Sequence, residues 1–434
     1  MTINRQVHQP ADQRETCLTI GSPSSEMNKR LKKKVRLAYL VSHPIQYQAP
    51  LLRRIAQEPD IDLTVFFGSD FSLRSYQDEG FGVDVQWDVP LLDGYRSEFL
   101  PVIRDDGTQT VTTPLNYGIF NALRGGEKPG FDVLWVHGYA MVNALHGMVA
   151  AKALGIPVLL RGDMWLRDRP RSGPKLFLKR AFFQLLKNLV SGVLTVGTLN
   201  EEYWRHYLGD EIPLFLMPYA VDNEYFQRRR LEAAPKREEL QRELHIDGGR
   251  PVILFASKLQ RRKRCSDLLD AYRSLMETAS CPLPYLLIVG DGEERVALEE
   301  QARTNGLADV RFCGFRNQSE LPRFFDIASV FVLPARHEPW GLVVNEAMNA
   351  ARAVIVSDDV GCHPDLISNG VEGFVFPVGD VKELAEALRR VLATPETTVR
   401  MGESALERIS TWSFEEDVLA LREAIARLTH KIVV

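Results

Sequence analysis

The chain has 434 residues and a mass of 49.1 kDa; 45% of its residues are hydrophobic and 25% are charged. These proportions are normal for globular proteins and exclude a wholly disordered, collagen-like or coiled-coil chain. The 53 Lys and Arg against 57 Asp and Glu give a net charge of -4, whereas dedicated nucleic-acid-binding proteins usually carry a basic excess. The 5 Cys are scattered, which fits reduced thiols in a cytoplasmic protein better than a disulfide framework or a zinc site.

Residues 1–33 are polar and aperiodic, which predicts a disordered tail without a secretory signal. The basic run from Lys29 to Arg36 either lies in solvent beside the first strand or contacts anionic lipid. No stretch reaches the ~18 uninterrupted apolar residues that a membrane span needs. We therefore expect a cytoplasmic protein, with peripheral contact at the inner membrane surface as an open alternative.

Short apolar runs alternate with helical periodicity along the whole chain. In the first half we expect strands at 35–41, 62–67, 133–137, 158–161 and 193–196, with helices at 50–57 and 173–189. In the second half we expect strands at 252–256, 285–289, 310–313, 330–333 and 353–357, with helices at 265–278, 294–304, 320–328 and 342–351. Near-continuous apolar strands between helices indicate parallel sheets covered on both faces. The prediction is an α/β protein with two doubly wound, Rossmann-like domains that face a central cleft.

The domain boundaries follow from where strand character stops. We expect an N-terminal domain at 34–225, an interdomain link at 226–249, and a C-terminal domain at 250–412. The link is charged and contains three consecutive Arg and a Gly pair. Ser413 and Glu416 have the spacing of a capping box, and apolar residues at helical spacing follow them. We expect 413–434 to form a helix that packs back on the N-terminal domain.

In open α/β sheets, ligands bind beyond the carboxyl ends of the strands. After the predicted strand 330–333, Glu338 lies in a loop and Glu346 on the helix that follows. Gly341 permits close approach of a ligand, and the amides of Leu342 and Val343 open a helix N-terminus, which suits a diphosphate. The two carboxylates bracket that anion site, where they can accept hydrogen bonds from the hydroxyls of a sugar and a ribose.

Other loops at predicted strand ends add cations and glycines. A basic cluster that includes Lys258 and Lys263 follows strand 252–256 and can neutralise a departing diphosphate. Gly290 begins the turn after strand 285–289. The loop after strand 310–313, where backbone groups can read a base edge, contributes Gly314, Phe315 and Arg316.

The first half has polar residues at equivalent strand ends. His43 follows the first strand and can bond a hydroxyl of either donor or acceptor, and His137 ends the strand 133–137. Arg161 and Asp163 follow strand 158–161. The helix at 173–189 carries several Leu, Phe and cationic residues, so it either packs on the sheet or lies on a membrane surface.

These residues resemble those of the nucleotide-sugar-dependent glycosyltransferases of family 4, which have the two-domain GT-B fold and retain the anomeric configuration. The resemblance covers about 250–425 well and 35–225 more loosely, and the spacing of Glu338 and Glu346 is its most specific mark. It implies that Glu338 contacts the donor sugar and Glu346 the ribose. It also implies that Lys258 and Lys263 bind the diphosphate, although the family usually has Arg at the first of these positions.

The same resemblance implies that the leaving phosphate takes the acceptor proton, so that no protein base is needed. Many relatives have a His near Arg161, and either Arg161 or Asp163 replaces it here. No Asp-x-Asp follows a strand in the second half, so we expect neither a metal nor another cofactor.

The sequence therefore predicts a retaining glycosyltransferase that moves a sugar from a UDP- or GDP-sugar to a carbohydrate, lipid-linked or small-molecule acceptor in glycan, polysaccharide or glycoconjugate biosynthesis. Two alternatives remain open: a nucleotide-sugar epimerase on the same fold, and a non-catalytic nucleotide-sugar-binding protein. We expect no nucleic-acid partner.

Overall fold

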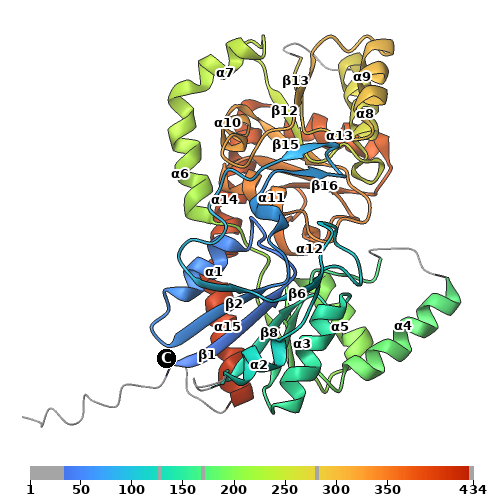
Figure 1. Ribbon diagram of the computed structural model, residues 1–434. Helices are drawn as coiled ribbons and strands as arrows, with labels where there is room; N and C mark the ends of the chain where they lie inside the picture. Colours follow the sequence, from blue (N-terminus) through green and yellow to red (C-terminus); the bar gives the residue numbers. More distant parts are fainter. Residues whose placement is uncertain (1–33, 126–129, 168–171, 279–282, 430–434) are drawn as a thin grey trace, which may run out of the picture.

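The computed structural model describes residues 34–125, 130–167, 172–278 and 283–429. They form two α/β domains, stacked one above the other in Figure 1. The expected tail at 1–33 lies outside the described residues. In the part of the chain that is described, no helix combines the length and the apolar character needed to cross a bilayer.

The N-terminal domain is built on a seven-stranded parallel sheet with the order β11-β10-β9-β8-β1-β2-β5. Its strands are β1 Val35–Val41, β2 Ile61–Phe67, β5 Arg96–Phe99, β8 Val133–His137, β9 Val158–Arg161, β10 Gly192–Thr195 and β11 Leu214–Leu216. Its helices are α1 Ala49–Ala56, η1 Phe71–Leu73, α2 Ile119–Arg124, α3 Val142–Ala153, α4 Gly173–Leu186 and α5 Thr198–Leu208.

The C-terminal domain is built on a six-stranded parallel sheet with the order β14-β13-β12-β15-β16-β17. Its strands are β12 Val252–Ala256, β13 Tyr285–Val289, β14 Val310–Gly314, β15 Val330–Leu333, β16 Ala353–Ser357 and β17 Gly373–Phe376. The helices of this half of the chain are η2 Ala234–Lys236, α6 Asn223–Ala233, α7 Arg237–Glu243, η3 Arg261–Lys263, α8 Cys265–Thr278, α9 Arg295–Thr304, α10 Leu321–Ile327, α11 Leu342–Asn349, α12 His363–Leu366, α13 Val381–Val391 and α14 Pro395–Ser410.

Both faces of each sheet are covered, which explains the apolar runs seen in the sequence. All five residues of β12 and of β13 are buried. Alternate residues of β12 enter different cores: Leu254 lies in the cluster that contains α10 and α11 residues, and Ile253 in the cluster that contains α8 and α13 residues. The predicted α/β fold with two doubly wound domains is confirmed.

The expected link differs in the structure. Most of 226–249 is helical, in α6 and α7, and these helices pack against the C-terminal domain. Phe226 is 2% exposed, and Leu240 and Ile246 join the core cluster of Val252 and Leu254. The charged residues dominated the sequence pattern of this segment, but a few apolar side chains suffice to anchor it.

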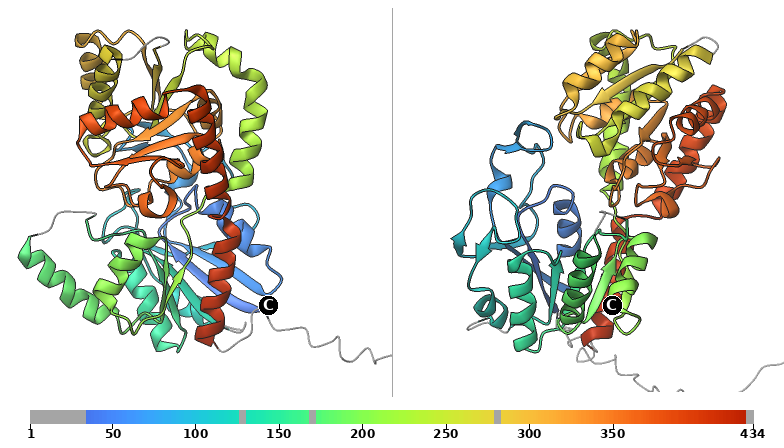
Figure 2. Two further views of the ribbon diagram at one scale, coloured as in Figure 1. Left: turned by 180° about the vertical axis from the view of Figure 1, so that it is seen from behind. Right: turned by 90° about the vertical axis from the view of Figure 1, so that its right-hand side faces the viewer.

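Helix α15 (Phe414–Thr429) is C-terminal in the chain but packs on the N-terminal sheet, beside β10 and β11. Figure 2 shows it running down along that domain. Ser413 starts it as a capping box, since its backbone N–H donates to Glu416 Oε2 at 2.9 Å. Leu421 and Ile425 are fully buried in the core cluster that contains Val35 and Tyr39.

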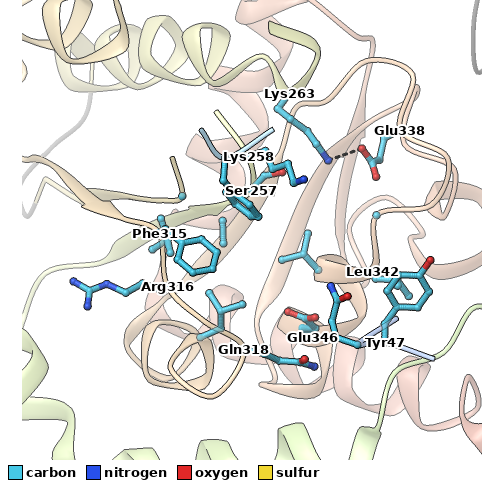
Figure 3. Close-up of a pocket in the computed structure, with 18 of the residues that line it drawn as sticks. Tyr47, Ser257, Lys258, Lys263, Phe315, Arg316, Gln318, Glu338, Leu342 and Glu346 are labelled. Carbon is cyan, nitrogen blue, oxygen red and sulfur yellow. Dashed lines mark hydrogen bonds and ion pairs between the residues drawn. The ribbon is translucent and has the colours of Figure 1, made fainter. Parts of the chain in front are cut away.

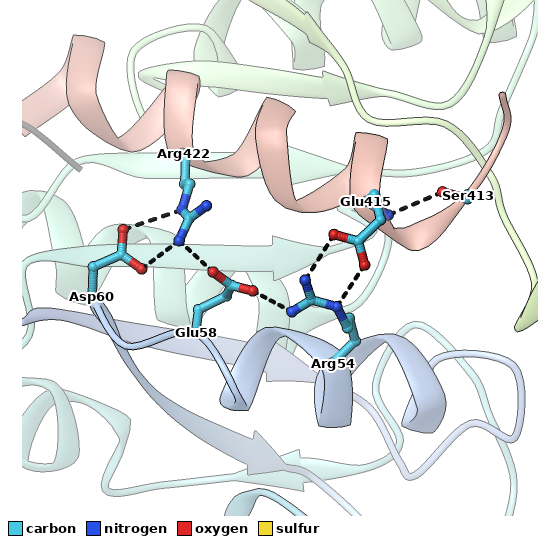
Figure 4. A network of polar contacts seen from close by, with 6 residues as sticks. All are labelled: Arg54, Glu58, Asp60, Ser413, Glu415 and Arg422. Carbon is cyan, nitrogen blue, oxygen red and sulfur yellow. Dashed lines mark hydrogen bonds and ion pairs between the residues drawn. The ribbon is translucent and has the colours of Figure 1, made fainter. Parts of the chain in front are cut away.

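A network of charges holds the exposed side of α15 against the turn after α1 (Figure 4). Arg54 donates to both oxygens of Glu415 at 2.7 Å. Arg422 donates to Asp60 at 2.8 and 3.1 Å and also pairs with Glu58. Because the groups share partners, the network fixes the position of α15 better than isolated surface pairs do.

Two short antiparallel hairpins leave the N-terminal sheet. One joins β3 Tyr76–Asp78 to β4 Val83–Val85, and the other joins β6 Val102–Arg104 to β7 Leu115–Asn116. The β3–β4 hairpin reaches the C-terminal domain, where Asp78 pairs with Lys258.

Candidate active site

A cavity of about 280 Å³ lies between the domains, beyond the carboxyl ends of the C-terminal strands. Ten of the residues that line it are labelled in Figure 3. The sequence-predicted residues among its walls are Lys258, Lys263, Gly290, Phe315, Arg316, Glu338, Gly341, Leu342, Val343 and Glu346. Gly314 lies directly before Phe315 but is not itself part of the wall.

The sheet order explains why residues far apart in the chain meet here. Strand β12 pairs in parallel with both β13 and β15. The strand order therefore runs outward from β12 in two opposite directions, to β13 and β14 on one side and to β15, β16 and β17 on the other. The loop after β12 holds Lys258 and Lys263, and the loop after β15 holds Glu338. Such a switch point in strand order is where ligands bind in open α/β sheets.

Glu338 is held by two cations. Lys263 Nζ donates to Glu338 Oε2 at 2.5 Å, and Arg262 Nη1 donates to the same oxygen at 2.8 Å. Burial acts to raise the pKa of Glu338, but Lys263 and Arg262 outweigh it and hold that pKa below its usual range. The backbone of Glu338 bonds Asp359 O and Gly361 N at 3.1 and 2.9 Å, which fixes the loop.

Glu346 has the opposite surroundings. It lies on α11 inside the cavity wall, and its Oε2 atom is buried without a hydrogen-bond partner among the described residues. Burial raises its pKa to about 8. A buried carboxylate without a partner is costly for the free protein. Glu346 is therefore ready to accept hydrogen bonds from a ligand.

Two glycines shape the anion side of the cavity. Gly341 has a φ of +92° and directly precedes α11. Leu342 and Val343, whose N–H groups belong to the first turn of that helix, line the same cavity as Lys258 and Lys263. At Gly290, a Cβ atom would lie 1.9 Å from Ser257 O, and only glycine lets the two strand ends approach this closely. The site thus combines amides and cations around one space.

The residues predicted on the N-terminal domain do not line this cavity. The ring of His43 bonds Ser42 and Gln109 at 2.9 and 2.8 Å, and burial lowers its pKa to about 4. Both ring nitrogens of His137 lie 3.1 Å from Gln48 Nε2. Burial first, and then the charge of Arg161, lowers the pKa of His137 to about 3.

Arg161 is 3% exposed and belongs to the interior. Its guanidinium donates to Met217 O at 3.1 Å and to Pro218 O at 2.7 Å, and it lies 3.4 Å from Asp417 Oδ1 on α15. The strand-end position suggested a ligand contact, but through these bonds the guanidinium joins β9, the segment after β11 and α15. Asp163 lies nearer the cavity, where its charge adds to burial in raising the pKa of Tyr47 to about 12.

Several cavity residues carried no local signal in the sequence. Tyr47 contacts the cavity from the N-terminal domain, and Gln318 follows the β14 loop. Phe81 and Trp87 come from the β3–β4 hairpin and the segment after it. Both hairpin strands are only three residues long, too short for their alternation to be recognised.

Within the described ranges, no three His, Cys, Asp or Glu side chains come together as a metal site would require. The three described cysteines, Cys265, Cys313 and Cys362, are free.

Comparison with known proteins agrees with this geometry. Residues 236–408 match the family model described as glycosyl transferases group 1. An alpha-D-kanosaminyltransferase of Streptomyces kanamyceticus is 31% identical over 172 residues, which are 39% of this chain and 43% of that protein. A D-inositol 3-phosphate glycosyltransferase of Nocardiopsis dassonvillei is 25% identical over 325 residues, 70% of this chain and 73% of that protein. The chain thus spans less than half of the first of these relatives and about three quarters of the second.

Solved structures share the fold. Sucrose-phosphate synthase of Thermosynechococcus elongatus superposes with a TM-score of 0.65 at 19% identity, covering 92% of this chain and 100% of that one. HepE of Anabaena, in a complex with UDP and glucose, also gives a TM-score of 0.65, at 16% identity over 91% of this chain and 100% of that one.

Fold and site together define the class that the chain resembles: the glycosyltransferases with the GT-B fold. Its C-terminal domain, which holds the cations and the paired carboxylates, matches the model of the group 1 glycosyl transferases. The resemblance to the GT-B glycosyltransferases that the sequence indicates is confirmed.

Proposed function

We propose that this protein is a retaining glycosyltransferase of the family 4 type, which transfers a sugar from a UDP- or GDP-sugar to an acceptor hydroxyl. The observation that carries the proposal is the arrangement of Lys258, Lys263, Glu338 and Glu346 around one interdomain cavity at the switch point of the C-terminal sheet. A cation cluster opposite a helix N-terminus suits a diphosphate, and the two carboxylates suit the hydroxyls on either side of it.

Each group has a role in the proposed mechanism. Lys258, Lys263 and the first amides of α11 hold the diphosphate and stabilise the charge that develops as it leaves. Lys263 has three N–H donors, so it can keep its bond to Glu338 while it contacts a phosphate oxygen. Glu338 then orients the sugar, and Glu346 accepts hydrogen bonds from the ribose diol.

In the transfer step, the bond between the anomeric carbon and the phosphate oxygen breaks, and a bond to the acceptor oxygen forms on the same face of the sugar. The proton of the acceptor hydroxyl moves to the leaving phosphate oxygen. Because the phosphate itself accepts the proton, the step requires no carboxylate or imidazole as base. The cations supply the positive charge that a divalent metal brings in other sugar transferases, so we propose that neither metal nor cofactor is needed.

The acceptor belongs to one of three chemical classes: a carbohydrate, a lipid-linked intermediate or a small molecule. The named relatives support a role in glycan, polysaccharide or glycoconjugate biosynthesis, since they include a kanosaminyltransferase, a D-inositol 3-phosphate glycosyltransferase and a glycogen synthase. We place the protein in the cytoplasm, where nucleotide sugars and reduced thiols are found.

Helix α4 supports peripheral contact with an anionic membrane. Phe177, Leu178 and Leu185 are 72%, 67% and 71% exposed on this helix, which carries three cations and no acidic residue. An apolar strip beside cations suits the surface of an anionic bilayer. We expect co-sedimentation with vesicles of phosphatidylglycerol and none with phosphatidylcholine. Equal co-sedimentation with both kinds of vesicle, or undiminished co-sedimentation of the Phe177→Ser variant with phosphatidylglycerol vesicles, contradicts membrane contact.

The test of the proposed function is a panel of UDP-, GDP- and ADP-sugars, each incubated with the full chain, with and without acceptors of the three classes. We expect slow hydrolysis of one donor alone, faster release of its nucleotide with one acceptor, and an α-linked product from an α-linked donor by NMR. The same rates in excess EDTA support metal independence. A new isomer of the donor sugar supports the epimerase, and binding without turnover supports the non-catalytic alternative.

A further inference from the structure

The β3–β4 hairpin of the N-terminal domain lies directly against the donor cavity of the C-terminal domain. Its turn is fixed by Asp78, whose Oδ1 atom accepts hydrogen bonds from Gly80 N at 2.8 Å and Phe81 N at 2.9 Å. This turn passes so close to the C-terminal domain that a Cβ atom on Gly292 would lie 2.9 Å from Gly80 O. The hairpin thus crosses the cleft.

The contacts that it makes are with the loops that form the cavity. Lys258 Nζ donates to both oxygens of Asp78, at 2.7 and 2.9 Å. The same ammonium lies 4.7 Å from the centre of the Phe81 ring. One cation of the proposed diphosphate site is therefore occupied by a carboxylate from the other domain.

A second set of contacts involves the loop after β14. The rings of Phe81 and Phe315 meet edge to face, with their centroids 4.8 Å apart. Asn317 Nδ2 donates to Gln86 O at 2.6 Å, and Asp88 accepts a hydrogen bond from Ser319. Trp87 lies between Gln86 and Asp88 in the sequence and lines the cavity. Gln318 lines the cavity too, and its buried Oε1 atom has no hydrogen-bond partner in the described part of the chain.

We propose that the β3–β4 hairpin completes the donor site, with Phe81 packing on the nucleobase beside Phe315, and with Asp78 holding the Lys258 ammonium until the donor diphosphate replaces it. This inference rests on the proposed function, because it takes the ligand to be a nucleoside diphosphate. The edge-to-face pair, with one ring from each domain, offers the base a continuous apolar surface. The unpaired Oε1 atom of Gln318 then accepts a hydrogen bond from an N–H group on the base edge.

Asp78 is a positioning residue that lowers the affinity for the donor by a measurable amount. A diphosphate that binds Lys258 must first take the ammonium from a carboxylate that already makes two charge-assisted hydrogen bonds. Replacement by asparagine removes the charge but keeps the oxygen that accepts from Gly80 N and Phe81 N, so the turn survives. Asp84 is the matched control, since it is exposed on β4 of the same hairpin and its change to Asn alters the net charge equally.

The experiment is calorimetric titration of the full chain with UDP, GDP and ADP, and with inorganic pyrophosphate as the probe without a base. For Asp78→Asn we expect about 3- to 10-fold tighter binding of both pyrophosphate and the preferred nucleotide, and for Asp84→Asn a change below about 2-fold. For Phe81→Ala we expect roughly 10-fold weaker nucleotide binding and unchanged pyrophosphate binding, and Phe81→Tyr restores the affinity.

Weaker binding in Asp78→Asn, or a change equal to that of Asp84→Asn, overturns the competition between Asp78 and the diphosphate. Equal effects of Phe81→Ala on nucleotide and pyrophosphate overturn the base contact. Both results leave the proposed function standing, because the wild type still binds a nucleotide. If the wild type binds none of the four probes, the proposed function fails and this inference fails with it. Thermal melting of each variant shows that it is folded.

Discussion

The two edges of the cleft use their polar residues differently. On the C-terminal side, Glu346 has a buried oxygen without a partner among the described residues, and Lys258 is paired only across the domain boundary. On the N-terminal side, Arg161 and His137 bond groups of their own domain or of α15. A carboxylate oxygen without a partner in a cavity wall is available to a ligand, whereas side chains whose partners lie in the interior hold the structure together.

This difference predicts which substitutions impair catalysis and which impair folding. The largest effect is expected for Lys263→Met, because the change removes a cation of the proposed diphosphate site and one of the two partners of Glu338. Loss of one preorganised donor at a developing charge typically costs about 10²–10³ in rate. We expect kcat/KM of the transfer reaction to fall by about 10³.

Arg261→Met is the control for Lys263→Met, because Arg261 is exposed on the same short helix, η3. We expect it to change kcat/KM by less than about 2-fold. Equal losses in the two variants would show that only the general positive charge of this loop matters.

The next largest effect concerns the N-terminal side. Arg161→Met removes one partner of a buried ion pair, which costs roughly 3 kcal/mol of stability by denaturant unfolding. Nucleotide affinity should stay within about 2-fold of wild type. A loss of nucleotide affinity without a loss of stability would show that Arg161 contacts the ligand.

The pH dependence sharpens this test. Burial raises the pKa of Asp417 to about 7, although Arg161 acts to lower it. A carboxyl whose pKa is raised by folding stabilises the protein below its unfolded pKa, and this stabilisation is lost as the pH rises through the folded value. Without Arg161 the pKa of Asp417 rises further. The difference in the free energy of unfolding between the wild type and Arg161→Met should therefore grow above pH 7. Adding Asp417→Asn should remove that growth.

The sequence predicted the strands well for a physical reason. A parallel strand covered on both faces is a continuous apolar run, and β8, β12, β13 and β15 begin and end where such runs do. The same logic missed β3, β4 and β5, which are short and partly exposed. The helices of the expected link were not predicted either, because only a few of their positions are apolar and they show no clear helical periodicity.

The candidate site divides in the same way. Glu338 and Glu346 are eight residues apart, so their relation was readable from the spacing. Asp78 and Lys258 meet although they are 180 residues apart, and nothing in either segment predicts the contact. The strand-end rule located Arg161 correctly but did not reveal that Met217, Pro218 and Asp417 bind its guanidinium.

A smaller effect separates the two carboxylates. Each change, Glu338→Gln or Glu346→Gln, removes a charge-assisted hydrogen bond of about 1.5–3 kcal/mol, or roughly 10- to 150-fold. The proposed contact of Glu338 with the sugar should strengthen as the glycosidic bond breaks, so its loss should lower kcat. The proposed contact of Glu346 with the ribose should be present in both the ground state and the transition state, so its loss should weaken binding of donor and free nucleotide. The reverse result, measured by kinetics and calorimetry, exchanges their roles.

The smallest expected effect is a proton released on binding. Burial raises the pKa of Glu346 to about 8, so the free protein holds this carboxyl mostly protonated at pH 7. A ribose diol that donates to the carboxylate favours the charged form and lowers that pKa. Nucleotide binding at pH 7 should therefore release close to one proton, measured by calorimetry in buffers of different ionisation enthalpy, and affinity should increase up to about tenfold between pH 7 and 8. Protons from the nucleotide phosphate appear equally in Glu346→Gln and cancel in the comparison. Equal proton release and equal pH dependence in the wild type and Glu346→Gln would mean that Glu346 does not hold the diol.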